Sequence, residues 1–478
     1  MIPVLLIFIP LLSGLIAFFL KEEKAAKSWS LLSSIITLAL TISGIFIYSH
    51  TNELSYDTAW LPTLGSRFSL HIDGMGKMLC LLTALSFPLV FVATYKNTYK
   101  QSAAFYALML LTQGGLMGVF IATDVLLFYF FWELALIPVY FLCSIWGGEK
   151  RIAVTFKFFI YTFVGSLLML IGILYLHYKT PDLTFSLDSF YHLTYSAKEQ
   201  NILFLLFFIA FAIKMPIFPL HTWQPDAYEQ SPTAVTMILS GVMVKMGIYA
   251  TLRWLIPMFP NSVNYFGNTI IILSIIGMIY ASLIAIKQDD IKRMIAYSSI
   301  AHIGLMSAAI FAQNKIGLDG VMIQMFNHGI NVIGLWIVAN VIEQQLGTRK
   351  FSELGGLAQK APSLAILLVV MALANIALPL TNAFVGEFLM FNGLFQYNVW
   401  IAAFAGISII LAAVYTLNMI QKIFYGNTVV STNNATDASK NVKVILALMV
   451  ILVILLGVYP QPMIELTKDT VNAILVKQ

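Results

Sequence analysis

Residues 214–249 have the sequence KMPIFPLHTWQPDAYEQSPTAVTMILSGVMVKMGIY. An apolar window at 201–219 leads into this stretch, and a second apolar window, 233–255, closes it. Windows of about 20 mostly apolar residues are long enough to cross a bilayer as helices. Pro216 and Pro219 interrupt the first window, and such a break is tolerated inside a membrane only against protein or a water-filled cavity. The stretch therefore predicts a helical membrane protein with a broken span.

The composition of the whole chain agrees with this prediction. Of its 478 residues, 59% are hydrophobic and only 10% are charged, whereas soluble domains carry roughly 25% charged residues. The net charge of +5 is small for this length, and no basic face for nucleic acid is visible. The two cysteines, Cys80 and Cys143, lie in apolar runs, which excludes a disulfide framework, a thiolate zinc site and an iron–sulfur cluster. We expect no metal and no cofactor in this chain, so any redox chemistry would take place on another one.

Apolar windows recur along the chain and predict about fourteen transmembrane helices in an all-α integral membrane protein. The window 363–391 is too long for one straight span and contains Pro379 near its middle, so we expect a second broken helix there. The fourteen windows are 2–20, 28–48, 74–95, 103–121, 123–146, 152–177, 201–219, 233–255, 267–286, 293–311, 318–341, 363–391, 399–421 and 443–459.

The two broken spans occupy matching places in two blocks of five helices. Helices four to eight, residues 101–255, contain the first break, and helices nine to thirteen, residues 256–425, contain the second. Because five is odd, the blocks would have opposite orientations, and inverted repeats with matching broken helices predict a transport site near mid-membrane. Residues 1–100 would form three N-terminal helices, and residues 426–478 a polar loop and the last helix.

The distribution of Lys and Arg predicts the orientation. Sixteen of the 27 Lys and Arg residues fall in the odd-numbered loops, and seven fall in the even-numbered loops and tails. Cytoplasmic loops carry the excess of positive charge, so the odd loops would be cytoplasmic. Both termini would then lie on the outer, periplasmic side of a bacterial inner membrane.

Six ionisable residues lie well inside the apolar windows, where a charge costs roughly 2.5–3.5 kcal/mol. They are Glu133, Lys214, Lys245, His302, His328 and Glu387. A pair of Glu133 with Lys214 that closed and opened would change how tightly Lys214 holds a proton. The alternatives are structural: a fixed salt bridge, a lysine that reaches the headgroups, hydrogen-bonded packing histidines, or a charge at a helix end.

Polar side chains accompany several of these groups. Ser298 and Ser299 share a helix face with His302, and Gln324 and Asn331 share a face with His328. Such stripes can hold a water chain, and histidine titrates near neutral pH. Na⁺ would favour oxygen ligands over lysines. We therefore predict a lateral proton relay, with supporting or hydrating residues Ser298, Ser299, His302, Gln324, Asn331 and His221.

Five of these stretches together resemble the antiporter-like membrane subunits of respiratory complex I, the NADH:quinone oxidoreductase, and of the Mrp antiporters. The resemblance covers nearly the whole chain, most clearly residues 100–425. The matching motifs are 214–249, FYFFWELALIPVYFL (128–142), KQDDIKRMIAYSSIAHIGL (287–305), FNHGINVIGLW (326–336) and LPLTNAFVGEFL (378–389).

Within this family the chain is most similar to the M-type, or chain-4-type, branch. Glu387 stands where other branches usually carry Lys, and the chain ends too soon after the last window for the long lateral helix of the L-type. It departs from the family pattern at Gln224, Tyr228 and Leu380, where relatives often have Leu, His and Gly. The resemblance implies a coupling ion pair of Glu133 and Lys214, a central relay Lys245, a bridge His328, a terminal Glu387, and hydration by His302.

The resemblance also implies a function and partners. The chain would be a proton-translocating subunit of a translocase, with FMN, the iron–sulfur clusters and the quinone on other subunits. Its partners would be the L-type subunit with its lateral helix, the N-type subunit, membrane lipids and protons, but not nucleic acid. Two alternatives stay open: a subunit of an Mrp-type Na⁺/H⁺ antiporter or membrane-bound hydrogenase, and a structural membrane scaffold.

Overall fold

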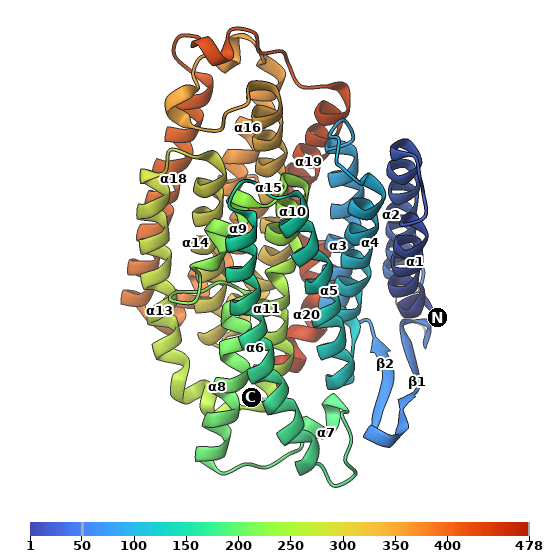
Figure 1. Ribbon diagram of the computed structural model, residues 1–478. Coiled ribbons are helices and arrows are strands. Elements are labelled where there is room, and N and C mark those ends of the chain that lie inside the picture. The colour runs from blue at the N-terminus through green and yellow to red at the C-terminus, as the bar shows by residue number, and fades with distance from the viewer. Residues whose placement is uncertain (49–51, 477–478) are drawn as a thin grey trace.

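The computed structural model describes residues 1–48 and 52–476, so a few positions of the predicted segments 1–100 and 426–478 lie outside the described residues. The described chain forms an elongated bundle of helices that run along a common direction (Figure 1). Eleven helices or helix runs in this part are long and apolar enough to cross a membrane. The predicted class, an all-α integral membrane protein, is confirmed. The count of fourteen spans and the inverted repeat stay predictions.

The eleven spans are α2 (Glu23–Phe46), α3 (Gly74–Ala93), α4 (Ser102–Ile121), α5 (Val125–Trp146), α6 (Arg151–Lys179), α10 to α12 (Thr233–Met258), α13 (Pro260–Lys287), α14 (Ile291–Phe311), α15 (Lys315–Leu346), α18 (Val399–Phe424) and α19 (Lys440–Val458). Two shorter apolar helices accompany them, α1 (Ile2–Ala17) and α16 (Pro362–Asn375).

Several long helices begin at an Asp or Asn that caps them. The side chain accepts a hydrogen bond from a backbone N–H of the first turn, which would otherwise lack a partner. The caps are Asp73 for α3, Asp124 for α5, Asp290 for α14, Asn314 for α15 and Asn398 for α18. These residues determine where each span begins. They therefore also determine how deep in the bundle each side chain of that span lies.

Burial separates central from peripheral helices. The run α10 to α12 and helix α15 are buried along their whole apolar length, and α14 nearly so. By contrast, α6, α18 and α19 expose large apolar side chains such as Ile171, Ile410 and Ile451. A helix that is apolar all round faces either the protein interior or lipid. The polar residues of interest therefore sit in the interior, behind an apolar outer surface.

Both predicted breaks are present. Helix α8 (Ala197–Lys214) ends at Lys214, and Pro216 and Pro219 lie in the irregular segment before α9 (Trp223–Gln230). Helix α16 ends at Asn375, and α17 (Asn382–Tyr397) begins after Pro379. Each break exposes backbone groups inside the bundle, where neighbouring side chains must satisfy them.

The eighth window is less regular than the plain helix predicted from its sequence. Two π-helical turns, Leu239–Met243 and Thr251–Leu255, flank α11 (Lys245–Ala250), and α10 (Thr233–Ile238) and α12 (Ile256–Met258) complete the run. A π-helical turn inserts a residue into the helix and frees a carbonyl group, and such turns are frequent at functional sites. Lys245 lies between two such turns, which is the first structural indication that it belongs to a functional site.

Some elements lie outside the predicted windows. Within the described residues they include the antiparallel hairpin β1 (Ser55–Leu61) and β2 (Ser66–His71), the short helices α7 (Leu187–Tyr191) and α9, several 3₁₀ turns and the C-terminal helix α20 (Gln461–Val476). The amino group of Met1 lies 3.1 Å from the carboxylate of Glu53. Thr470 of α20 donates a hydrogen bond to Asp73. Met1 and helix α20 thus lie toward the end of the bundle that carries the hairpin (Figure 1). That this end is periplasmic stays a prediction.

Candidate functional site

Lys245 occupies the centre of the bundle and is fully buried. Its Nζ atom lies 2.8 Å from Nδ1 of His328 on α15 and donates to the carbonyl oxygen of Ser240 at 2.8 Å. Ser240 belongs to the first π-helical turn, so the irregular helix supplies the acceptor. A lysine buried without carboxylate contact requires such polar partners. The local sequence therefore builds a polar pocket around one ammonium group.

The contacts continue from His328 to the second broken helix. The rings of His328 and His302, which is on α14, have centroids 5.5 Å apart. Nδ1 of His302 lies 3.0 Å from Oε1 of Glu387 on α17. These four side chains, Lys245, His328, His302 and Glu387, are all buried, and we call them the Lys245–Glu387 file. Four predicted residues from four helices thus form one row of titratable groups.

Three side-chain amides on one face of helix α15 donate hydrogen bonds to the two helices that flank the second break. The donor–acceptor pairs are Gln324 to the Glu387 carboxylate at 3.3 Å, Asn327 to the Asn382 carbonyl at 2.7 Å, and Asn331 to the Ala374 carbonyl at 3.2 Å. Ala374 lies in the last turn of α16 and Asn382 is the first residue of α17, so α15 supports the backbone on both sides of the break. Gln324 and Asn331, which share a face with His328, donate these hydrogen bonds to the broken helix, and the water chain expected along that face stays a prediction.

The predicted serines differ in their surroundings. Ser298 accepts hydrogen bonds from the Asn375 amide at 3.2 Å and from the Tyr415 hydroxyl of α18 at 3.1 Å. The same Asn375 amide lies 3.4 Å from Nε2 of His302. The buried hydroxyl of Ser299 has no hydrogen-bond partner in the described part of the chain. Ser298 therefore belongs to the surroundings of His302, whereas Ser299 has a free hydroxyl for other contacts.

Glu133 and Lys214 are not in contact. Lys214 is buried, and its Nζ atom lies 5.3 Å from the centre of the Trp132 ring, a cation–π arrangement. Neither the Lys214 ammonium nor Oε1 of Glu133 has a hydrogen-bond partner among the described residues. The ion pair expected from the sequence is thus open in this conformation. A buried ammonium group without a partner is costly, and so is a carboxylate oxygen without one, so both require water or each other.

Two further residues of the first break lie apart from the file. The His221 ring packs on Phe218 and Tyr280, with centroids 5.7 and 5.4 Å away, and its Nδ1 has no described partner. Tyr228, which stands where relatives often have His, is fully buried and packs edge-on against Trp336 of α15. The ring contacts of both residues are with aromatic side chains outside the file.

Sequence reasoning missed three residues of this site, Asn327, Asn375 and Tyr415. Each is a polar group inside an apolar window, which was the signal that singled out its charged neighbours. Asn327 directly precedes His328, and Asn375 stands four residues before Pro379. Because neutral polar residues are less costly in a membrane than charges, their presence alone is a weaker signal.

Comparison with known proteins places the chain. Residues 122–412 match the family described as "NADH:quinone oxidoreductase/Mrp antiporter, TM". The chain belongs to this family. NADH-quinone oxidoreductase subunit M of Rhodobacter capsulatus is 36% identical over 464 residues, which cover 94% of this chain and 90% of that protein. Subunit M of Escherichia coli K12 is 34% identical over 492 residues, 98% of this chain and 96% of that one.

Solved structures share the whole fold. A chain of respiratory complex I from Thermus thermophilus with bound NADH is 27% identical and superposes with a TM-score of 0.93, covering 100% of this chain and 99% of that one. A chain of the Mrp complex from Dietzia sp. DQ12-45-1b is 19% identical with a TM-score of 0.87, covering 99% of each, which shows the fold alone. The predicted family and its M-type branch are confirmed.

Proposed function

We propose that this chain is a non-redox, proton-translocating membrane subunit of NADH:quinone oxidoreductase in a bacterial inner membrane. Relatives that match it over nearly its whole length are M subunits of that enzyme, and its fold matches a chain of a respiratory complex I. The observation that carries the proposal is the Lys245–Glu387 file. Buried titratable groups inside a membrane protein mark ion pathways and proton relays.

In the proposed path, protons pass between adjacent members of the file. The contacts of Lys245 with His328 and of His302 with Glu387 are short enough for direct transfer through a hydrogen bond. The step between the two histidine rings, with centroids 5.5 Å apart, needs a bridging water or a ring movement. Neutral histidine has one ring nitrogen that donates and one that accepts, so it can receive a proton on one side and release one on the other.

Glu133 and Lys214 would control how the file is loaded. Closing this ion pair would hold a proton on Lys214, and opening it would leave an unpaired ammonium in the protein interior, which favours proton release. The open arrangement in the structure supports an ion pair that switches rather than a fixed salt bridge. Quinone reduction on other subunits would drive the change between the two arrangements.

The remaining parts of the proposal concern the assembly. FMN, the iron–sulfur clusters and the quinone would be held by other subunits. The neighbours would be the L-type subunit with its lateral helix and the N-type subunit, and both termini would face the periplasm. The relatives at 34 to 36% identity favour this assembly over an Mrp antiporter or a hydrogenase.

The scaffold alternative is less compatible with where the charges lie. Lys245 and His328 are 0% and 2% exposed, so this chain's own residues cover them. A charge that holds a partner subunit must reach the surface. The file is therefore better placed for internal transfer than for subunit contact.

The test uses membrane vesicles that contain the whole complex. Lys245→Met keeps most of the side-chain volume and removes the titratable group. We expect an assembled complex on native gels that has lost proton uptake and, because the two are coupled, NADH-driven quinone reduction. Lys315→Met is the matched control, because Lys315 is exposed at the start of α15. Normal proton uptake by the assembled Lys245→Met complex would refute the proposal that the file carries protons. Failure of the complex to assemble would favour the scaffold alternative.

Glu133→Gln and Lys214→Met test the ion pair in the same vesicles. Both variants should assemble and lose proton uptake, because each replaces one member of the ion pair with a neutral side chain, so that the pair can no longer form. Proton uptake should also persist in sodium-free buffer. Dependence on sodium would point to the antiporter alternative.

A further inference from the structure

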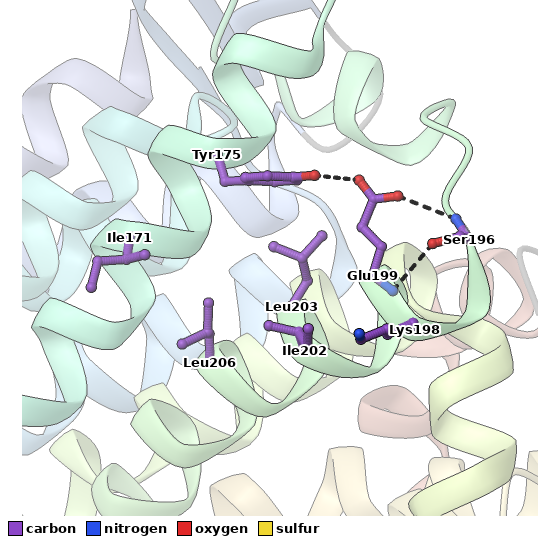
Figure 2. Close-up of a pocket in the computed structure, with 8 residues that line it drawn as sticks. All are labelled: Ile171, Tyr175, Ser196, Lys198, Glu199, Ile202, Leu203 and Leu206. Carbon is purple, nitrogen blue, oxygen red and sulfur yellow. Dashed lines mark hydrogen bonds between the residues drawn. The ribbon is translucent and has the colours of Figure 1, made fainter.

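A groove runs between α6 and α8 at the end of the bundle that carries the hairpin. It has a volume of about 500 Å³, and its walls are apolar side chains of both helices: Ile171, Ile202, Leu203 and Leu206. Figure 2 shows these side chains on the two sides of one space. Ile171 and Ile202 are more than half exposed, so the groove opens on the outside of the bundle. In a membrane, an apolar groove on this surface faces lipid.

One end of the groove is polar. Glu199 accepts a hydrogen bond from the Tyr175 hydroxyl at 2.6 Å and forms an ion pair with Lys179 (Figure 2 shows the tyrosine contact). Glu199 and Ser196 also form a reciprocal capping box at the start of α8. The charge of this carboxylate is therefore neutralised by Lys179, and its position is fixed.

Lys198 adds a positive charge beside this neutralised pair. Its side chain is exposed at the mouth of the groove, and it forms no ion pair within the part of the chain that the structure describes. It also stands in the first turn of α8, whose N-terminal N–H groups carry partial positive charge. With Lys179 and Glu199 cancelling, the polar end carries a net charge of +1 and suits an anion.

Tyrosines indicate the depth of this polar end in the membrane. Tyr175 lines the groove, Tyr178 is 75% exposed one turn further along α6, and the Tyr195 ring lies 5.1 Å from the Lys179 ammonium. Tyrosine and tryptophan gather where the hydrocarbon meets the headgroups. The polar end of the groove thus lies at headgroup depth, and the apolar walls extend into the hydrocarbon.

We propose that this groove binds an anionic glycerophospholipid of the bilayer. One acyl chain lies between α6 and α8 against Ile171, Ile202 and Leu206. The phosphate group lies beside Lys198 at the start of α8. This inference does not rest on proton transfer, because none of these residues belongs to the Lys245–Glu387 file.

The experiment uses the whole complex in nanodiscs. The probe is phosphatidylglycerol with a photoactivatable diazirine on one acyl chain, compared with phosphatidylethanolamine that carries the same chain. Light-induced labelling is mapped to the peptides of α6 and α8 by mass spectrometry. We expect phosphatidylglycerol to label the groove more strongly than phosphatidylethanolamine. Lys198→Glu should lower the phosphatidylglycerol labelling by at least about fivefold, because the loss of one lysine charge near an anionic headgroup already has about that effect.

Two further variants make the result specific. Lys468→Glu changes the charge equally at an exposed lysine of α20 and should leave the labelling unchanged. Ile202→Trp fills the groove and should lower the labelling by both lipids. If Lys198→Glu fails to assemble, Ile202→Trp still tests whether a lipid occupies the groove.

Two outcomes would overturn the proposal. The first is equal labelling by both lipids that is unchanged in Lys198→Glu and in Ile202→Trp. That result would mean that ordinary annular lipid surrounds the protein here. Absence of labelling, together with chemical cross-linking of Lys198 to another subunit, would mean that a neighbouring subunit covers the groove.

Discussion

Leu380 is held in a backbone conformation that disfavours it. Its φ angle is +73°, in the left-handed region where the Cβ atom of an L-residue crowds the carbonyl oxygen. Its side chain is 69% exposed, so little packing within the chain offsets this cost. Ala377, at φ +55°, is in the same situation on the other side of Pro379. The second break thus contains strain that glycine would avoid.

Leu380→Gly should stabilise the protein. Removing the left-handed cost of about 1–2 kcal/mol outweighs the added freedom of glycine in the unfolded chain, roughly 0.5–1 kcal/mol. Thermal unfolding of the purified chain in detergent would measure the gain. The control is Leu378→Gly, two residues earlier and without a positive φ, which should destabilise. Equal effects of the two substitutions would contradict the assignment of strain to Leu380.

At the residue scale, the sequence located the members of the file, whereas the order Lys245, His328, Glu387 came only from the family resemblance, which left His302 out of the row. Charged residues in apolar windows are costly enough to be recognised one by one, which located Lys245, His328 and Glu387. Their contacts depend on which helices are neighbours, and a single sequence does not contain that information. His302 was therefore predicted to serve hydration, whereas the structure places it between His328 and Glu387.

At the scale of elements, close helix approach positions Lys245 relative to Lys214. Gly247 on α11 lies against the end of α8, and a Cβ atom at this position would come within 2.7 Å of the Met215 nitrogen and the Phe211 oxygen. Both are backbone atoms, which cannot rotate away. The missing side chain of Gly247 is therefore what allows α11 to approach the first break.

Gly247→Ala should push α11 away from α8. We expect a loss of about 1–3 kcal/mol of stability, typical of overpacking, and less proton uptake from the same number of assembled complexes. Gly406→Ala is the control, because nothing lies within 4 Å of the added Cβ in α18. That substitution should be neutral or slightly stabilising. Normal uptake by Gly247→Ala would show that the spacing of α11 and α8 is not critical.

Asp437 lies in the loop between α18 and α19 and binds the first turn of α16. It accepts hydrogen bonds from the N–H groups of Ser363 and Leu364 and forms an ion pair with Lys443 at 2.8 Å. Burial alone would raise the pKa of the Asp437 carboxyl, but these hydrogen bonds hold its pKa well below the ordinary value of 3.8. The folded state therefore prefers the charged carboxylate.

The stabilisation by Asp437 should depend on pH. A carboxyl whose pKa is lowered by folding stabilises the protein above the unfolded value and loses that effect as the pH falls through the folded value. The melting temperature of the wild type should exceed that of Asp437→Asn at pH 6, and the difference should shrink below about pH 4. Asp188→Asn, at an aspartate 80% exposed, is the control. A difference independent of pH would contradict the ionic origin.

The sequence predicted the two broken helices because proline acts locally. It did not predict the π-helical turns beside Lys245, since these depend on the packing of the whole run against its neighbours. Helix α20 also escaped the search for apolar windows, because only one of its faces is apolar. An amphipathic helix of this kind is recognised by periodicity rather than by mean hydropathy.

At the scale of the whole molecule, one carboxylate joins three distant segments. Asp73 caps α3, its Oδ2 atom lies 2.5 Å from Arg253 of the second π-helical turn, and it accepts a hydrogen bond from Thr470 of α20 at 3.0 Å. These segments are nearly 400 residues apart at the extremes. Asp73 therefore fastens the C-terminal helix to the core of the bundle.

Asp73→Ala should destabilise the protein by about 3 kcal/mol, because it leaves a largely buried arginine without its carboxylate. Limited proteolysis should then cut within α20, and thermal unfolding would measure the loss. Thr470→Val removes one hydrogen bond only and should cost about 1 kcal/mol. Equal losses in the two variants would show that the arginine pair contributes little.

The depth of the file has a consequence for the electrical behaviour of the protein. His328 and His302 lie near the middle of their helices, Lys245 lies near the middle of the run α10 to α12, and Glu387 follows a break at mid-span. The row therefore runs across the bundle rather than along it. The membrane potential acts along the bilayer normal, where a full crossing by one charge involves about 2.3 kcal/mol per 100 mV. Protons that moved sideways along the proposed path would follow an equipotential surface. The voltage dependence of turnover would then arise from the steps that connect the row to the two aqueous phases, and not from the row itself.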